Sequence, residues 1–163
     1  GKNLTVFENK ATFTNIFKEE ENVAFNGTAK SMHQKWGVAT LLNHAEKYLN
    51  SPYLWGGRSP FGIDCSGFTQ VVFRTAGYTL PRDSSQQIAK GKEVDFADRK
   101  AGDLVFFTNS NGKMNHVGLL TEPDRIIHAS GKVRIDVFDQ KGIKNLEQNT
   151  YTHHFFKLKR IIT

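Results

Sequence analysis

Cysteine is nearly absent from this chain, because Cys65 is the single thiol among 163 residues. An internal disulfide is therefore impossible, and the redox compartment stays open. Protein zinc sites are usually built from paired Cys and His residues, but the six histidines here include no His-x-x-x-His pair and the lone Cys65 has no Cys-x-x-Cys partner. The sequence therefore predicts no metal site.

Long apolar runs are also missing. No stretch approaches the roughly 18 residues that span a bilayer, so we expect no integral membrane segment. Gly56, Gly57 and Gly62 match neither the Walker nor the dinucleotide spacing, which argues against a nucleotide cofactor. Lysine and arginine give a net charge of +6 but are scattered, so no nucleic-acid-binding stripe is evident. The charge either favours anionic surroundings, such as acidic wall polymers, or only aids solubility.

Apolar residues are plentiful enough for a folded core. Hydrophobic residues make up 38% of the chain and aromatic residues 12%, with thirteen Phe. The length fits one domain, or one domain with an appendage. Residues 1–35 hold only short apolar clusters, too few for a core of their own, and are interpreted as an N-terminal arm or the remnant of an upstream module. Residues 36–163 form the main domain in this interpretation.

The hydrophobic period changes along the main domain. Apolar residues recur at steps of three and four over 38–49 and 65–75, and a short helix is expected over 84–90. A period of two then predicts five strands, over 103–108, 115–121, 125–129, 133–138 and 154–161. Helices followed by strands indicate an α+β domain whose N-terminal helices pack on one face of a five- to six-stranded antiparallel sheet.

Cys65 stands where a glycine-rich loop gives way to the second predicted helix. An isolated cysteine is usually a small buried hydrophobe. Its neighbours Asp64, Ser66 and Gly67 are polar or tiny, however, which is a poor setting for a core thiol. A helix N-terminus stabilises an anion, so we expect a lowered thiol pKa and free N–H groups for an oxyanion. Asp64 is the expected N-cap.

His116 and His128 lie on two successive predicted strands. A lone strand histidine commonly has no task, but a cysteine nucleophile needs a base, and a strand holds an imidazole rigidly. Adjacent antiparallel strands can bring two such side chains together. His33, His44, His153 and His154 are weaker candidates, the last two because they would point to opposite faces of one strand.

In order and spacing, several segments together resemble the NlpC/p60 family of bacterial cell-wall cysteine peptidases. The resemblance covers roughly residues 38–160. The segments that carry it are Tyr53-Leu54-Trp55-Gly56-Gly57, Asp64-Cys65-Ser66-Gly67-Phe68, Leu80-Pro81-Arg82, Gly102-Asp103-Leu104-Val105-Phe106-Phe107, His116-Val117-Gly118 and Ile127-His128-Ala129.

The resemblance implies a papain-like fold and a cysteine endopeptidase that needs no cofactor. Cys65 would be the nucleophile, His116 the base, and His128 the residue that orients His116. The implied partner is the stem peptide of peptidoglycan, or a muropeptide, cut between γ-D-glutamate and a diamino acid.

The resemblance also implies the residues that bind this substrate. Asp64 and Ser66 would help to hold its N-terminal amine, and Tyr53 would place a hydroxyl near the reacting carbonyl. Trp55 and Ser84 would line the cleft. Helix capping by Asp64 and loop packing by the others are the simpler interpretations.

Two alternatives remain from the sequence. One is an amidase or acyltransferase that uses the same Cys-His pair, and the other is a non-catalytic cell-wall-binding domain. The implied substrate favours the cell envelope or a secreted protein, with cytoplasmic recycling also open, and we expect a monomer.

Overall fold

A computed structural model describes residues 5–7, 10–14, 20–24, 34–109, 111–145 and 149–163. The chain divides into two compact units, Gly1–Gln34 and Lys35–Thr163. In the first, β1 (Thr5–Phe7), β2 (Lys10–Thr14) and β3 (Glu20–Ala24) form a small antiparallel sheet. The remaining residues before 34 lie outside the described part, and the assignment of 1–35 as an arm or module remnant stays a prediction.

The second unit begins with helices, as its periodicity predicted. Helix α1 spans Val38–Glu46, α2 spans Cys65–Thr75 and α3 spans Ser84–Gln87. Between the first two, β4 (Arg58–Ser59) and β5 (Gly62–Ile63) form a short hairpin. No helix in the described part of the chain is long and apolar enough to cross a membrane.

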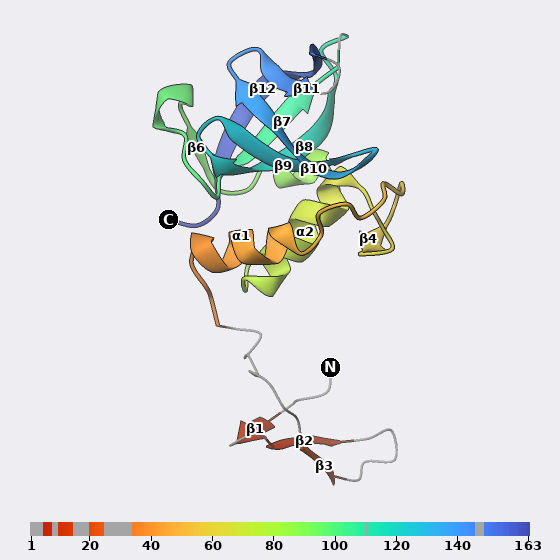
Figure 1. Cartoon of the computed structure of the whole chain (residues 1–163). Helices are drawn as coiled ribbons and strands as arrows, with labels where there is room; N and C mark the ends of the chain where they lie inside the picture. Colours follow the sequence, from red (N-terminus) through yellow and green to blue (C-terminus); the bar gives the residue numbers. More distant parts are fainter. Residues whose placement is uncertain (1–4, 8–9, 15–19, 25–33, 110, 146–148) are drawn as a thin grey trace. The chain divides into compact units, whose positions relative to one another are not determined.

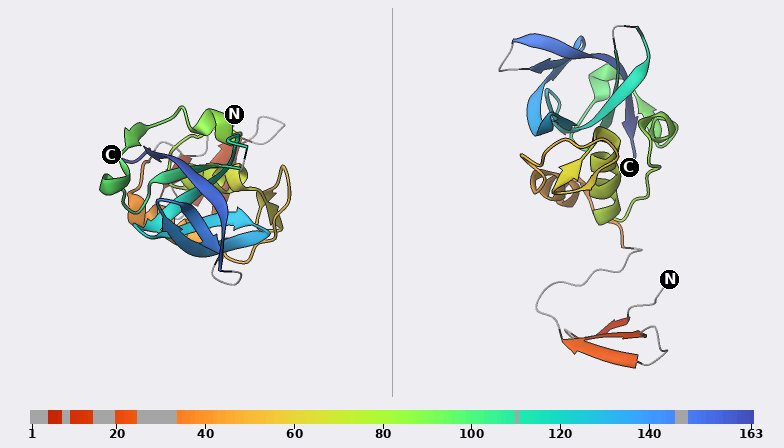
Figure 2. Two further views of the ribbon diagram at one scale, coloured as in Figure 1. Left: turned by 90° about the horizontal axis from the view of Figure 1, so that it is seen from above. Right: turned by 90° about the vertical axis from the view of Figure 1, so that its right-hand side faces the viewer.

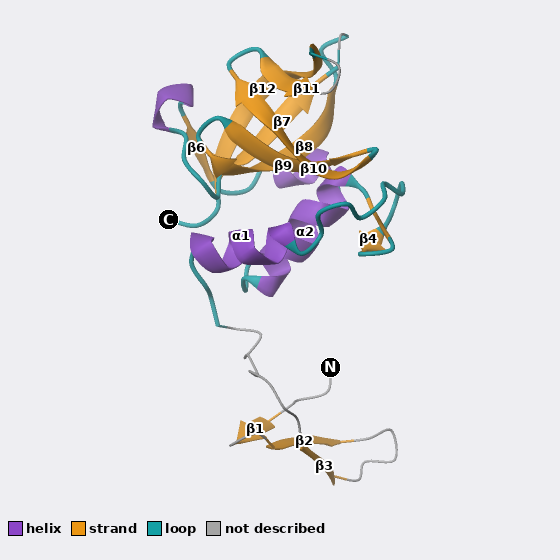
Figure 3. Cartoon of the chain, in the orientation of Figure 1, coloured by secondary structure: helices purple, strands orange, loops and turns teal. Residues whose placement is uncertain are grey.

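The strands that follow α3 form an antiparallel sheet that curls into a barrel (Figures 1 and 3). Strand β12 pairs with β7 on one side and with β11 on the other, which closes a ring of six strands, and β6 extends it at β12. The bounds are β6 Lys92–Val94, β7 Leu104–Thr108, β8 Met114–Glu122, β9 Arg125–Ser130, β10 Lys132–Asp139, β11 Gly142–Asn145 and β12 Thr150–Arg160. A one-turn helix, Phe96–Asp98, follows β6.

The predicted fold class is therefore wrong. The sequence indicated helices packed on one face of a five- to six-stranded antiparallel sheet, whereas six strands of the second unit close into a barrel. Two details explain the error. The five predicted strands do not include β11, which is only four residues long, and the last of them starts at 154 although β12 begins at Thr150. The early part of β12 is the part that pairs with β11 and closes the ring.

The period of two divides the buried residues of the barrel strands between two cores. Val105 and Phe107 of β7 belong to an inner cluster that takes at least one side chain from each of the six strands. Leu104 and Phe106 alternate with them and face a second cluster shared with the helices. Because β7 is buried on both faces, its sequence reads as one continuous apolar run.

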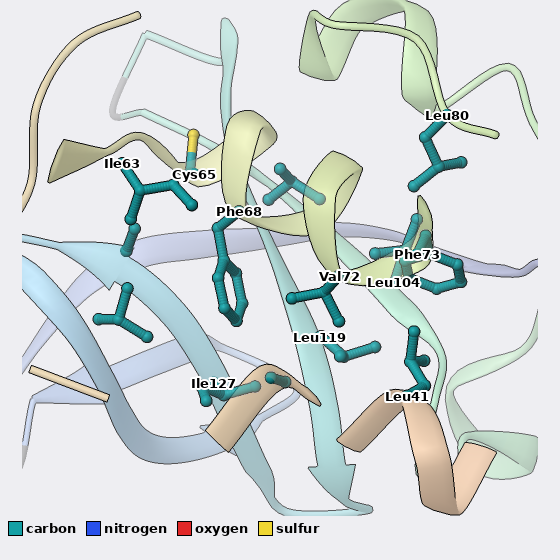
Figure 4. Close-up of a cluster of buried hydrophobic side chains, with 14 of the residues drawn as sticks. Leu41, Ile63, Cys65, Phe68, Val72, Phe73, Leu80, Leu104, Leu119 and Ile127 are labelled. Atoms are coloured by element: carbon teal, nitrogen blue, oxygen red, sulfur yellow. The ribbon is translucent and has the colours of Figure 1, made fainter. Parts of the chain in front are cut away.

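The helices α1 and α2 lie together on one side of the barrel, as two views agree (Figures 1 and 2). Phe68 and Val72 of α2 point toward the strands that carry Leu119 and Ile127 (Figure 4). Burying a side chain of this size contributes roughly 2–3 kcal/mol. This packing fixes α2, and with it the position of Cys65, against β8 and β9.

The closure at β11 generates a test. Gly142 has a φ of 140°, and a Cβ there would collide with the carbonyl group of His153 on β12. We expect Gly142→Ala to lower the free energy of unfolding by about 3 kcal/mol in urea titrations, because strain and collision add. Gly112→Ala is the matched control: its φ is 74° but no atom lies near the added methyl group, so about 1 kcal/mol is expected. Equal losses in the two variants would contradict the role assigned to the β11–β12 contact.

Candidate active site

One pocket of about 920 Å³ gathers most of the predicted site residues. It lies where the N-terminus of α2 meets β8, α3 and the loop that precedes β4. The predicted residues that line it are Cys65, His116, Tyr53, Trp55, Asp64, Ser66 and Ser84. His128 is not part of the lining, because it lies behind His116 and is almost fully buried.

The first turn of α2 is held by Asp64, as predicted. Its carboxylate accepts a hydrogen bond from the backbone N–H of Gly67 at 2.7 Å and another from Gly56 at 2.8 Å. The same carboxylate pairs with Arg82, which also donates to the Ser66 hydroxyl at 2.9 Å. Burial opposes ionisation of Asp64, but these hydrogen bonds outweigh it and hold its pKa below the usual value. Asp64 is therefore an ionised cap that orders the loop around the thiol.

Cys65 is the first residue of α2, and its side chain is 8% exposed at the pocket. Its sulfur points away from the neighbouring apolar side chains (Figure 4). Burial raises the pKa of this thiol, although backbone N–H groups of Val117, Ser66 and Cys65 itself act in the opposite direction. The prediction of a lowered thiol pKa is therefore wrong for the free protein, since desolvation outweighs the helix terminus.

Behind the thiol, three buried side chains form a hydrogen-bonded chain. Nε2 of His116 lies 2.9 Å from Nδ1 of His128, and Nε2 of His128 lies 3.0 Å from Oδ2 of Asp136. Burial lowers the pKa of His116 well below its ordinary value, and the neighbouring His128 and His153 lower it further. Burial also lowers the pKa of His128, against the opposing effect of Asp136. The resting imidazoles are thus neutral.

The strand register explains how the two rings meet. His116 and Gly118 share a face of β8, and a Cβ added at Gly118 would lie 3.0 Å from the Cβ of His128. The atoms nearest to such a Cβ belong to Ile126, at 2.6 and 2.8 Å, so glycine leaves room for the side chains of β9, and the ring of His128 meets that of His116 diagonally across the two strands. The predicted contact between His116 and His128 therefore follows from the antiparallel pairing of β8 with β9.

Two residues of the site, Asp136 and Arg82, had no predicted role, and a third, His153, was only a weaker candidate. Asp136 lies in a run that alternates polar and apolar residues, as any strand does. Its contact with His128 depends on the pairing register of β9 and β10, which the sequence does not show. Arg82 lies in a segment that carried the family resemblance, but its partner Asp64 is 18 residues away in the chain. His153 was ranked low, yet its ring stacks on His116 with centroids 4.1 Å apart, and burial lowers its pKa to about 4. His44 lies on α1 outside the pocket lining, and His33 lies outside the described residues.

The Asp64–Arg82 pair makes stability depend on pH. Arg82→Met leaves a buried carboxylate without its cation, so we expect a loss of roughly 3 kcal/mol at pH 7. The folded pKa of Asp64 is depressed, so its contribution is complete above the ordinary value of 3.8 and disappears as the pH falls through the lower folded pKa. The difference between wild type and variant should therefore shrink on acidification.

Urea titrations at pH 7, 4 and 2.5 measure this dependence. Arg74→Met is the matched control, because Arg74 is an exposed residue in the last turn of α2. We expect it to change stability by less than about 0.5 kcal/mol at each pH. A constant difference between wild type and Arg82→Met across this range would show that the ion pair does not carry the effect.

Comparisons with known proteins agree with the motifs of this site. The NlpC/P60 family matches residues 50–160. The chain is 43% identical over 98 residues to a gamma-D-glutamyl-L-lysine dipeptidyl-peptidase of Bacillus subtilis, over 59% of this chain and 33% of that protein. It is 42% identical over 89 residues to a probable endopeptidase p60 of Listeria innocua, over 55% of this chain and 19% of that protein. The chain thus spans a third or less of these curated relatives.

A solved structure shows the same similarity in three dimensions. An NlpC/P60 family protein from Bacillus cereus superimposes with a TM-score of 0.76 at 27% sequence identity, over 98% of this chain and 53% of that one. The family match covers the segment that holds every residue of the hydrogen-bonded chain described above. As its motifs predicted, the chain belongs to the NlpC/P60 family.

Proposed function

We propose that this protein is a cysteine endopeptidase that hydrolyses the bond between γ-D-glutamate and a diamino acid in peptidoglycan stem peptides. The observation that carries the proposal is that Cys65 shares one pocket with His116, whose ring is held by His128. A nucleophile, a base and a group that orients the base are the minimum set for acyl transfer. The choice of bond is supported by the similarity to the gamma-D-glutamyl-L-lysine dipeptidyl-peptidase of Bacillus subtilis.

The proposed reaction begins from a neutral thiol and a neutral imidazole. His116 takes the proton of Cys65 as the sulfur attacks the substrate carbonyl, and the C–S bond forms. N–H groups at the start of α2 and the Tyr53 hydroxyl stabilise the oxyanion. Burial raises the pKa of Tyr53, so this hydroxyl keeps its proton at neutral pH.

The second half of the reaction returns the enzyme to its starting state. His116 gives its proton to the leaving amine as the C–N bond breaks, which leaves a thioester on Cys65. Water then attacks the thioester with His116 again as base, and the acid product and free thiol are released. Each step uses side chains and N–H groups of this chain.

The substrate-binding roles of the other pocket residues belong to the same proposal. The carboxylate of Asp64 is already engaged by Arg82, Gly67 and Gly56, which favours a structural role over direct capture of the substrate amine. Trp55 is 84% exposed at the rim and is free to pack against the stem peptide. The peptidoglycan substrate favours action at the cell envelope or after secretion.

The first test removes the nucleophile. Cys65→Ala should lower kcat/KM for a defined stem peptide by at least about 10⁴-fold, because no other thiol can form the thioester. Mass spectrometry of the wild-type products should show cleavage after γ-D-glutamate. Cys65→Ser retains the size of the side chain and should also be inactive.

A matched histidine pair completes this test. His116→Ala should abolish cleavage, whereas His154→Ala, exposed on β12 beside His153, should cleave like wild type. Cleavage by folded Cys65→Ala would refute the cysteine mechanism. Binding of stem peptides by wild type without any product would favour a wall-binding domain, and transfer or deamidation products would favour the acyltransferase or amidase alternative.

The pH profile gives a second test of the base. Because the pKa of His116 lies well below its ordinary value of 6.5, the imidazole stays unprotonated on moderate acidification. We therefore expect kcat/KM to remain on its plateau through pH 6.5 and to fall only at lower pH. Initial rates between pH 4 and 8 in buffers of constant ionic strength measure this limb, and a midpoint above 6.5 would contradict the neutral resting base.

A further inference from the structure

Asp136 is an almost fully buried carboxylate at the far end of the histidine chain. It lies on β10, whose residue Arg134 is directly opposite His128 of β9. Asp136 is two positions further along the same face, so it is a diagonal neighbour of His128. Its Oδ2 lies 3.0 Å from Nε2 of His128 and 2.8 Å from Nε of Arg134, and its Oδ1 accepts from Nη2 of Arg134 at 3.0 Å.

A carboxylate at this place determines where the protons of both imidazoles lie. Ionised Asp136 can only accept, so Nε2 of His128 must carry a proton. In a neutral ring Nδ1 of His128 is then an acceptor, and the neighbouring Nε2 of His116 must donate to it. The proton of His116 is thus on Nε2, and its Nδ1 lone pair is left for the thiol. With the proton on Nδ1 instead, the lone pair of His116 would lie on Nε2, which faces His128, and no basic nitrogen would be left for the thiol.

The surrounding charges keep Asp136 ionised. Arg134 on β10 is the cation in contact with it, and the rings of His128 on β9, His116 on β8 and His153 on β12 are neutral at rest. Burial disfavours the charged carboxylate, but the hydrogen bonds from His128 and Arg134 hold the pKa of Asp136 below its usual value. Replacing an ion pair by apolar side chains of similar size is often tolerated by a fold.

We propose that Asp136, held by Arg134, is a positioning residue that sets the tautomers of His128 and His116 and so presents Nδ1 of His116 as the base for Cys65. This inference rests on the proposed function for its catalytic consequence, but the tautomers are a property of the free protein. Asp136 does not line the pocket, and it acts only through His128.

The test replaces the whole ion pair, Arg134→Leu with Asp136→Leu. Long-range ¹H–¹⁵N spectra of the free protein identify which nitrogen of each imidazole carries the proton. In wild type both His116 and His128 should carry it on Nε2, and in the double variant this preference should be lost. The value of kcat should fall by about 10²–10⁴-fold, with KM within threefold of wild type. Asp139→Asn, at the partly exposed C-terminal end of β10 and outside the pocket lining, should leave tautomers and kcat unchanged.

The single variant Arg134→Leu keeps the proposal testable if the double variant does not fold. It retains the carboxylate but removes the cation that favours its ionised form, so the tautomers should stay as in wild type at pH 8. The acid limb of kcat/KM should move to higher pH, because protonated Asp136 no longer requires a donor from His128.

Three outcomes would overturn the proposal: wild-type tautomers in the folded double variant, kcat within threefold of wild type, or an unmoved acid limb in Arg134→Leu. A wild-type protein that cleaves no stem peptide would instead defeat the proposed function. The spectra of the free protein would still decide the role of Asp136 in that case.

Discussion

The pairing register of β8, β9 and β10 is the constraint on which the site depends. Each histidine or acid of the hydrogen-bonded chain comes from a different strand, and each contact is a diagonal step between neighbouring strands. A slip of one residue would turn His128 or Asp136 to the opposite face. The spacing and register of these three strands therefore set the distances between the two imidazoles and the carboxylate.

The second half of the site is carried by a helix, and both halves share one core. Helix α2 places Cys65 at its first residue, while Phe68 and Val72 on the same helix pack against the wall strands. Apolar packing thus determines the distance between the thiol and the strand that holds His116. The ion pair between Asp64 and Arg82, with the hydrogen bond from Gly56 to Asp64, orders the loop that precedes the thiol. The pocket residue Cys65 and the core residues Phe68 and Val72 are thus neighbours on one helix.

Local signals in the sequence predicted much of this arrangement, and long-range pairing accounts for the rest. Helix α2 was predicted from Cys65 to Thr75 and spans those residues, because its apolar spacing and its Asp64 cap are local. The barrel closure was missed, since β11 has four residues and gains its pairing only from β12. Asp136 was missed, and His153 was only a weaker candidate, for the same reason: their partners are set by register and by closure of the ring.

The barrel interior also explains why the thiol and the imidazoles rest without charge. The inner apolar cluster fills the barrel up to Phe107, whose ring lies 5.9 Å from that of His116. A charged imidazole at this boundary would lose hydration on its apolar side, which is the main reason that the pKa of His116 is low. Asp136 is the one ionised member of the chain, and Arg134 compensates its charge directly. The network therefore holds one ion pair at its base, and the imidazole that lines the pocket rests neutral.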